Sequence, residues 1–203
     1  METLLSRYNG EDMVVIAAIA HGIWTRKNHV VHGGKFAHPN FIVKEAEEWI
    51  SPPPGRLKAN WDVALNADGK RVATGVIIRD DKGLVIAALS RTVEACLAPV
   101  TAKAMGMLQA TEFCQDLRMS DIVLEGDSLQ GVQAVNAKGD QWLQFGQIIA
   151  DIQVVLSQFR RCEVLHAKRE ANFDFAAHGL AKVAAQEPTE KIWKEDIHLC
   201  ILM

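Results

Sequence analysis

The sequence lacks most of the features that mark secreted, zinc-binding or membrane proteins. Its four cysteines (Cys96, Cys114, Cys162 and Cys200) are widely spaced and form no CxxC pair. This spacing favours reduced thiols inside a cell over a disulfide framework or a zinc site. The longest apolar run near the start, residues 13–20, is too short to span a bilayer. The acidic pair Glu11–Asp12 precedes this run, where a secretory signal would carry positive charge, so we expect neither export nor membrane insertion.

Neither positive nor negative charge predominates in the sequence, which has 22 Lys and Arg and 25 Asp and Glu residues. The net charge of -3 argues against a broadly basic protein that coats nucleic acid, although it permits a local basic patch beside an acidic metal site. Hydrophobic residues make up 49% and charged residues 23% of the chain, which is the balance of a soluble globular protein. The 203 residues suffice for one core of ordinary size, and they contain no internal repeat.

The three consecutive prolines divide the chain. Before them, apolar residues recur at helical spacing from Val14 to Ile23, and a second helix is predicted from about Asn40 to Ile50 with Phe41, Ala46 and Trp49 as its apolar members. No helix or central strand tolerates the run Ser51–Gly55. The predicted division is therefore an N-terminal helical extension (1–50), a proline-rich linker (51–56), a domain (57–186) and a C-terminal tail (187–203).

Strands and helices are expected in a definite order within the domain. Alternating and β-branched patterns, separated by turn residues, predict an antiparallel meander of three strands. Helices and two short strands are predicted to follow, and the order β-β-β-α-β-α-α-β-α indicates an α/β (mixed α+β) fold with a five-stranded mixed sheet flanked by helices. The expected strands are 57–65, 72–78, 84–89, 122–124 and 162–167, and the expected helices are 100–117, one beginning near 128, 142–159 and 175–185.

Three aspartates stand where strands end or helices begin. Asp62 lies within the first strand, Asp127 directly follows the fourth, and Asp174 stands at the start of the last helix. Carboxylates at the ends of adjacent strands can converge and hold magnesium, and two such ions can position water and neutralise a phosphodiester. Asp127 and Asp174 could instead cap helices, with Asn172 competing for the second cap. Asp62 points more clearly to function, because a carboxylate in an apolar strand is costly unless it is paired or bound to a cation.

Four motifs then resemble a known family. They are Pro-Pro-Pro-Gly-x-Leu-Lys-x-Asn-Trp-Asp at 52–62, Gly-Val-Ile-Ile-Arg-Asp at 75–80, Glu-Gly-Asp-Ser-Leu at 125–129, and Arg-Glu-Ala-Asn…Ala-Ala-His-Gly-Leu-Ala-Lys at 169–182. In this order they resemble the plant-type ribonuclease H domain of non-LTR retroelements and its stand-alone relatives, over residues 49–182. The resemblance implies a ribonuclease H-like fold, location in the nucleus or cytoplasm, and hydrolysis of the RNA strand of RNA/DNA hybrids with Mg²⁺ or Mn²⁺.

The resemblance also implies an Asp-Glu-Asp-Asp set of metal-binding carboxylates. By position, Asp62 is the first and Asp127 the third, so both are predicted metal ligands. Lys103 stands in the place of the second, a glutamate. An ammonium about 4 Å from a divalent ion is repelled by on the order of 8 kcal/mol at an effective dielectric near 20. Either Lys103 swings outward and the metal loses a ligand, or its ammonium fills the metal position and neutralises the aspartates; both alternatives weaken two-metal catalysis.

The fourth position is irregular, and the substrate contacts are less specific. The family places Asp or His four residues after an asparagine, whereas His178 lies six residues after Asn172, so either His178 keeps the role or Asp174 serves. Further candidates for contacts to hydroxyls or phosphates are Asn60, Ser128, Asn172, Arg169, Arg79, Arg160, Arg161, His166 and Lys168. The histidines at 29, 32 and 38 lack companions at metal spacing and are interpreted as loop residues.

Three functional hypotheses remain open at this stage. The chain could be a magnesium-dependent endoribonuclease acting on RNA/DNA hybrids, a non-catalytic module that binds hybrid or RNA, or a protein-interaction domain, with the N-terminal helices as a possible site for a protein partner. Lys103 favours the second and third hypotheses. Retention of Asp62 and Asp127 favours binding of cations and nucleic acid.

Overall fold

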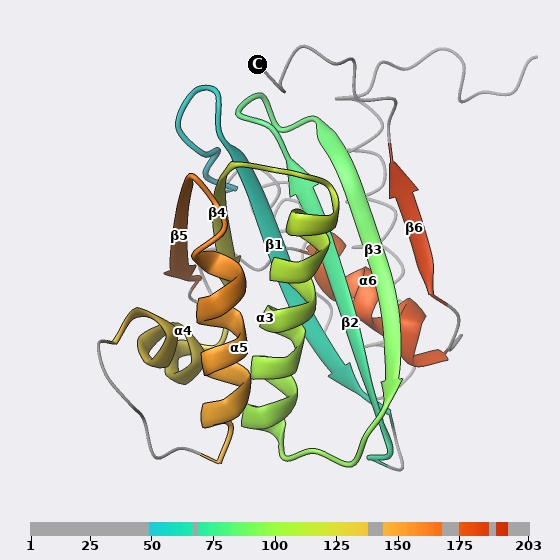
Figure 1. Cartoon of the computed structure of the whole chain (residues 1–203). Helices are drawn as coiled ribbons and strands as arrows, with labels where there is room; N and C mark the ends of the chain where they lie inside the picture. The colour runs from blue at the N-terminus through green and yellow to red at the C-terminus, as the bar shows by residue number, and fades with distance from the viewer. Residues whose placement is uncertain (1–48, 67–68, 138–143, 168–174, 187–189, 195–203) are drawn as a thin grey trace, which may run out of the picture.

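The architecture is a mixed sheet with helices on both faces (Figure 1). The computed structural model describes residues 49–66, 69–137, 144–167, 175–186 and 190–194. Helices α3, α4 and α5 lie on one face of the sheet, and α6 lies behind the lower part of β2 and β3 in Figure 1. The elements are β1 (Leu57–Leu65), β2 (Arg71–Arg79), β3 (Val85–Glu94), α3 (Pro99–Asp116), β4 (Asp121–Gly126), α4 (Leu129–Asn136), α5 (Gly146–Leu156), β5 (Arg161–His166), α6 (Phe175–Gln186) and β6 (Lys191–Lys194).

The predicted α/β class is confirmed, but the sheet has six strands and not five. The strand order is β5-β4-β1-β2-β3-β6. β1, β2, β3 and β6 pair in antiparallel fashion, while β4 pairs in parallel with both β1 and β5. β6 lies in the segment that was predicted to be a tail. Its four residues are too few for a recognisable alternation, and the edge of β3 supplies their pairing partners.

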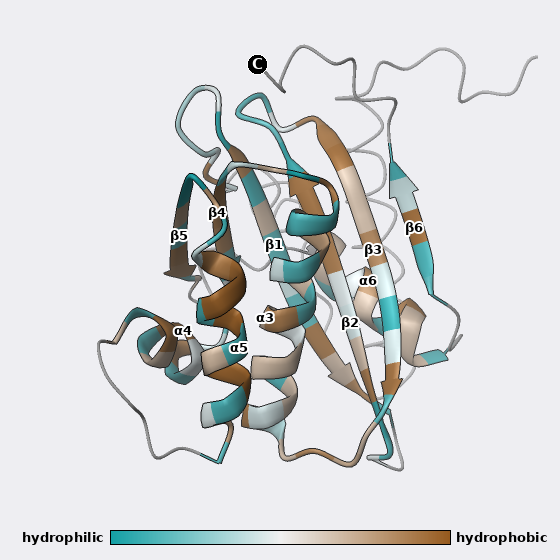
Figure 2. Ribbon diagram, in the orientation of Figure 1, coloured by the Kyte–Doolittle hydropathy of each residue, from teal (hydrophilic) through white to brown (hydrophobic). Residues whose placement is uncertain are grey.

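Alternation along β1 sends successive side chains to opposite faces of the sheet. Leu57, Ala59 and Trp61 are buried in the core beneath α3, α4 and α5. The apolar stretches of α5 and the central strands in Figure 2 belong to this core. Lys58 and Asn60 therefore point to the face that carries α6, together with Asp62.

Helix α6 lies directly against the sheet because β2 has a glycine at the contact. A Cβ at Gly75 would lie 2.1 Å from the backbone oxygen of Ala177 and 2.4 Å from the backbone nitrogen of Ala181. The β3 hydroxyl of Thr92 donates a hydrogen bond of 2.7 Å to the carbonyl of Ala184, and the hydroxyl of Ser90 donates one of 3.1 Å to an earlier carbonyl of the helix. These contacts fix the position of α6, and with it that of His178 on this helix.

The segment before β1 is bonded to the sheet. The Trp49 indole N–H donates to Asn60 Oδ1 at 3.2 Å, and Lys58 Nζ donates to the carbonyl of Ile50 at 2.7 Å. Trp49 and Ile50 are not helical, so the predicted helix limit at Ile50 is wrong. Proline disfavours helical backbone at the residue before it, here Ser51, and the hydrogen bonds of Trp49 and Ile50 to β1 hold the preceding residues against the sheet.

None of the described helices has the length and apolar character needed to cross a bilayer. The N-terminal extension up to residue 48 lies outside the described residues, and the domain boundaries stay an interpretation.

Candidate active site

Two aspartates follow a pair of facing residues on neighbouring parallel strands. Trp61 of β1 pairs in register with Gly126, the last residue of β4, and Asp62 and Asp127 are the residues that come next in the chain. Each aspartate side chain is only 16% exposed. The close approach of the Trp61 side chain depends on Gly126, because a Cβ there would lie 2.3–2.7 Å from atoms of the indole. The Trp61 indole thus occupies the space that a side chain at position 126 would need.

Lys103 forms an ion pair with the second of these aspartates. It lies near the start of α3, and its Nζ is 2.7 Å from Asp127 Oδ2. The helix comes close enough because Gly106, one turn later, has no side chain: a Cβ there would lie 2.2 Å from Val63 Cγ2. Of the two alternatives for Lys103, the structure therefore has the ammonium turned into the site and paired with a carboxylate.

His178 is the partner of Asp62, as Lys103 is the partner of Asp127. Its Nδ1 is 2.6 Å from Asp62 Oδ2, a hydrogen bond between α6 and β1. The histidine side chain is 25% exposed, so one part of the ring reaches solvent. The structure thus joins four of the predicted site residues in two pairs, Asp62 with His178 and Asp127 with Lys103. The other predicted site residues in the preceding loop, Arg169, Asn172 and Asp174, lie outside the described residues.

Two candidate substrate contacts lie inside the protein instead. Asn60 is 3% exposed, donates from Nδ2 to Glu125 Oε1 at 3.0 Å, and accepts the Trp49 indole hydrogen bond. Ser128 is 4% exposed, and its Oγ accepts from the Gly131 amide at 3.3 Å as the N-cap of α4. Ser128 caps α4, so the prediction that Asp127 could serve as the cap of this helix is wrong.

Sequence reasoning missed a buried ion pair next to the site. Lys58 Nζ is 2.9 Å from Glu125 Oε2, and the two side chains are 4% and 6% exposed. Lys58 lies in the motif at 52–62 and Glu125 in the motif at 125–129, but neither motif indicated that the two residues would form an ion pair. The signal was present in the alternation of β1, which places Lys58 on the same face as Asn60 and Asp62.

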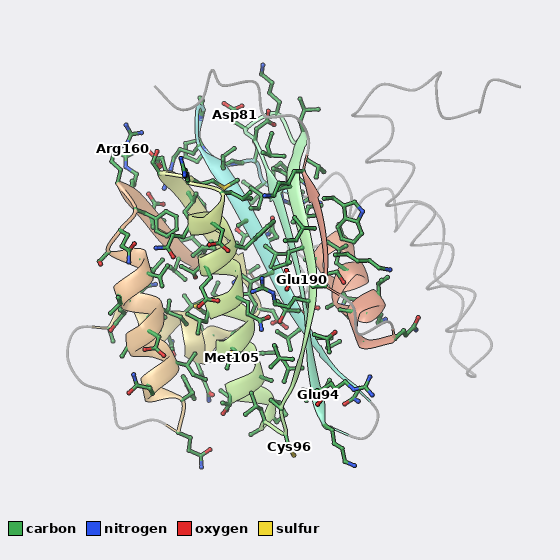
Figure 3. All side chains as sticks on the ribbon, turned by 45° about the vertical axis from the view of Figure 1, so that its right-hand side comes forward. Asp81, Glu94, Cys96, Met105, Arg160 and Glu190 are labelled. Atoms are coloured by element: carbon green, nitrogen blue, oxygen red, sulfur yellow. The ribbon has the colours of Figure 1, made fainter. Side chains whose placement is uncertain are left out.

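The arginines that were candidates for phosphate contacts lie elsewhere. Arg160 and Arg161 approach Asp121 Oδ2, at 3.5 and 4.0 Å, and Asp121 begins β4 at the end opposite Asp127. Figure 3 shows Arg160 at the same end of the sheet as Asp81, far from Glu94 and Cys96. Arg79 is 7% exposed and stacks over the Trp49 ring, 5.2 Å from its centroid.

The Asp121 end is held by Arg56, which is 5% exposed. This guanidinium bonds to Asp121 at 2.6 Å, to Glu163 at 2.7 Å and to the Ile122 carbonyl at 2.9 Å, so it ties β1 to β4 and β5. Burial opposes the charge, but the hydrogen bonds to Glu163 and Asp121 prevail and raise the pKa of Arg56. Arg56, Asp121 and Glu163 therefore stabilise the packing of β1 beside β4 and β5.

A magnesium site of the predicted kind does not fit the described side chains. One oxygen of Asp62 is bonded to His178, and one oxygen of Asp127 to Lys103. Across the described residues, no group of three His, Cys, Asp or Glu side chains gathers as metal ligands. Divalent magnesium prefers several oxygen ligands, whereas this arrangement offers two carboxylates and a neighbouring ammonium.

Comparison with known proteins identifies the family. Residues 60–184 match the family described as "Reverse transcriptase-like", which is more than half of the chain. The chain belongs to the reverse transcriptase-like family. The matched range contains Asp62, Lys103, Asp127 and His178, and it confirms the ribonuclease H-like domain that the motifs resemble. The narrower assignment to plant retroelements stays a prediction.

Solved structures share the fold of this reverse transcriptase-like domain. Ribonuclease H1 from the archaeon Halobacterium salinarum superposes with a TM-score of 0.56 at 23% identity, covering 66% of this chain and 99% of that one. The N-terminal ribonuclease H domain of a Mycobacterium tuberculosis protein gives 0.54 at 17% identity, with coverages of 66% and 99%. LC11 ribonuclease H1, in complex with an RNA/DNA hybrid, gives 0.54 at 18% identity, with coverages of 64% and 97%. No curated protein matches the chain.

Proposed function

We propose that this domain binds RNA/DNA hybrid or RNA and that its own side chains, rather than divalent ions, balance the charge of the two aspartates. The observation that carries the proposal is the ion pair of 2.7 Å between Lys103 Nζ and Asp127 Oδ2. In this arrangement the ammonium stands beside the carboxylates where the related enzymes would need a metal. Hydrolysis of the RNA strand is accordingly expected to be weak or absent.

The charges of the site support binding without metal. Lys103 offsets the charge of one of the two aspartates, which lowers the negative charge that a phosphate would meet at the site. Lys103 is 25% exposed, which leaves part of its ammonium accessible from solvent. An ammonium with three donors can bind a phosphate oxygen while it retains a carboxylate partner.

Hybrid or RNA is the favoured ligand because of the family and the fold. A similar fold holds an RNA/DNA hybrid in the LC11 ribonuclease H1 complex. Proteins that recognise such helices use backbone shape and 2′-hydroxyls, so we expect little sequence preference. We also expect the affinity to fall as the salt concentration rises, because phosphate contacts release counterions on binding.

The experiment compares the native protein with Lys103→Glu and, as a matched charge-reversal control, Lys82→Glu in the exposed turn between β2 and β3. A labelled hybrid of about 20 base pairs, slightly longer than the ~16 base pairs that domains for double-stranded RNA span, is followed by anisotropy in EDTA and by gel after addition of Mg²⁺ or Mn²⁺. We expect EDTA-resistant binding by the native protein, little cleavage, and a gain of metal-dependent cleavage in Lys103→Glu only.

Each result has a defined meaning. Strong metal-dependent cleavage by the native protein would contradict the weakened site, and loss of binding in EDTA would contradict binding without metal. Equal behaviour of Lys103→Glu and Lys82→Glu in the cleavage assay would show that Lys103 is not what holds the site inactive.

A further inference from the structure

Strand β6 forms one edge of the sheet (Figure 1), and it carries an exposed aromatic side chain. Trp193 is 46% exposed. The other phenylalanine and tryptophan side chains that the structure describes are all more deeply buried. An exposed indole leaves a large, flat apolar surface in water, and tryptophan is among the residues that contribute most to binding at interfaces. The Trp193 ring is therefore a candidate contact for a flat ligand.

The sheet holds this tryptophan in a defined position. All four residues of β6 pair with β3, and Trp193 lies opposite Ala88. Just before β6, Glu190 forms an ion pair with Arg91 of β3, with 2.7 Å between Oε2 and Nε. The indole thus projects from a strand that backbone pairing and an ion pair fix in place. Binding to such a preorganised side chain costs little ordering of the backbone.

A lysine lies on the same face of β6 as the indole. Side chains that are directly opposite in adjacent strands point to the same face of a sheet. Lys191 is opposite Ser90, two residues from the partner of Trp193 in β3. Because the Ser90 hydroxyl donates to a carbonyl of α6, Lys191 and Trp193 both point to the face that carries this helix. They are about 7 Å apart along the strand, so the ammonium can reach a ligand that stacks on the indole.

The lysines at the two ends of β6 argue against another strand as the partner. Figure 2 shows these hydrophilic ends on either side of the apolar middle of the strand. If two copies of β6 paired in antiparallel register, Lys191 of each would lie opposite Lys194 of the other, and like charges in that position destabilise the pair. An exposed aromatic ring beside ammonium groups instead matches single-stranded nucleic acid, whose bases stack on such rings and whose phosphates bind cations.

We propose that Trp193 stacks on an unpaired base of RNA and that Lys191 binds a phosphate of the same strand. The inference deepens the proposed binding of RNA and rests on it, because it adds a second contact on the same domain. Asp62, Gly75, Ser90 and Lys191 follow one another across the sheet, so Lys191 lies three strand spacings, or about 14 Å, from Asp62. A single strand covers this distance with at least about four nucleotides, at about 3.4 Å each. Helix α6 crosses the row over Gly75, which makes the path longer.

Binding of a labelled single-stranded RNA of about 12 nucleotides, a length within the usual range for one binding domain, tests this contact by anisotropy on the full chain in EDTA. The variants are Trp193→Ala, Trp193→Phe and Lys191→Ala. The matched control is Ile192→Ala, because Ile192 is the neighbouring residue of β6, is 44% exposed and points to the other face of the sheet. The hybrid duplex of the preceding experiment is measured in parallel with each variant.

We expect Trp193→Ala to weaken binding of the single strand about 5- to 100-fold, the effect of losing one stacked base. Trp193→Phe should retain most of the affinity because its ring still stacks, and Ile192→Ala should bind as the native protein does. Lys191→Ala should reduce the slope of log affinity against log salt by about 0.7, the value for one phosphate contact of a single strand. RNA that carries iodouracil should crosslink to Trp193 under near-ultraviolet light.

Several results would overturn the contact at β6. They are equal affinity of Trp193→Ala and the native protein for the single strand, an equal loss in Ile192→Ala, and crosslinks confined to other residues. A dimer that Trp193→Ala dissolves, seen by sedimentation, would assign the edge to a second copy and would overturn the proposal as well. If the hybrid is bound while Trp193→Ala has no effect on the single strand, only this inference fails. If the native protein binds neither hybrid nor single strand, the proposed function fails too.

Discussion

Replacing Gly106 by alanine should destabilise the protein, although the same change in the middle of a helix normally stabilises it. Alanine is favoured over glycine by about 1 kcal/mol in a helix interior. Here, however, the new Cβ would lie 2.2 Å from Val63 Cγ2, more than 1 Å inside ordinary contact distance. Val63 is β-branched and has few alternative rotamers, so α3 or β1 has to move. Overpacking of this kind costs about 1–3 kcal/mol, which leaves a net loss of about 1 kcal/mol.

The second arm of a double-mutant cycle isolates this contact. In a Val63→Ala background the opposing methyl group is gone, so Gly106→Ala should now stabilise the protein by about 1 kcal/mol. The coupling between the two sites is then about 2 kcal/mol, measured as free energies of unfolding by urea titration followed by circular dichroism. The reasoning is refuted if Gly106→Ala stabilises the native background as much as the Val63→Ala background. Because Gly106 lies one turn after Lys103, the variant also tests whether close packing of α3 keeps the ammonium on Asp127.

Three further predictions concern the site and the core. Lys103→Met should cost about 1–3 kcal/mol in thermal or urea unfolding, since it leaves the Asp127 carboxylate without its cation, and adding Asp127→Asn should recover most of the loss. Gly126→Ala should lower the unfolding free energy by about 3 kcal/mol, because the Trp61 indole fills the place of the Cβ; an unchanged urea midpoint would contradict this contact. Burial raises the pKa of Glu112, so the stability that this residue contributes is present at acid pH and is lost as pH rises through the raised value. Glu112→Gln should therefore stabilise the protein at neutral pH and not at acid pH, and a pH-independent difference would exclude that cause.

Much of the site could be predicted from local patterns. The alternation of β1 placed Asp62 on a strand, and the short strand before Asp127 made it foreseeable that the two aspartates follow facing residues, since parallel neighbours end at the same edge. The presence of Lys103 at the glutamate position was visible in the motif. The partner of Lys103 was not visible, because two placements of its long flexible side chain satisfied the sequence equally well. The structure shows the placement on Asp127, with α3 packed closely against β1 at Gly106.

Other roles depended on packing that no local pattern contains. Asn60 and Ser128 stand next to the two aspartates in sequence, which made them candidates for substrate contacts, yet both are buried and bonded within the protein. Alternation gives the face of a strand residue, but it does not say which element covers that face. In the case of Asn60 the covering group is Trp49, from the segment that was assigned to the extension.

The amino-acid sequence by itself determined the class of the fold, the order of its main elements, the family and the two aspartates, because hydrophobic periodicity and motif spacing are local properties of the chain. Only the tertiary structure decided that His178 reaches Asp62, that Lys103 pairs with Asp127, and that β6 completes the sheet. Each of these contacts joins segments far apart in the sequence. Their geometry depends on where α3, α6 and the β3 edge come to lie, and this in turn depends on the absence of a side chain at Gly75 and Gly106.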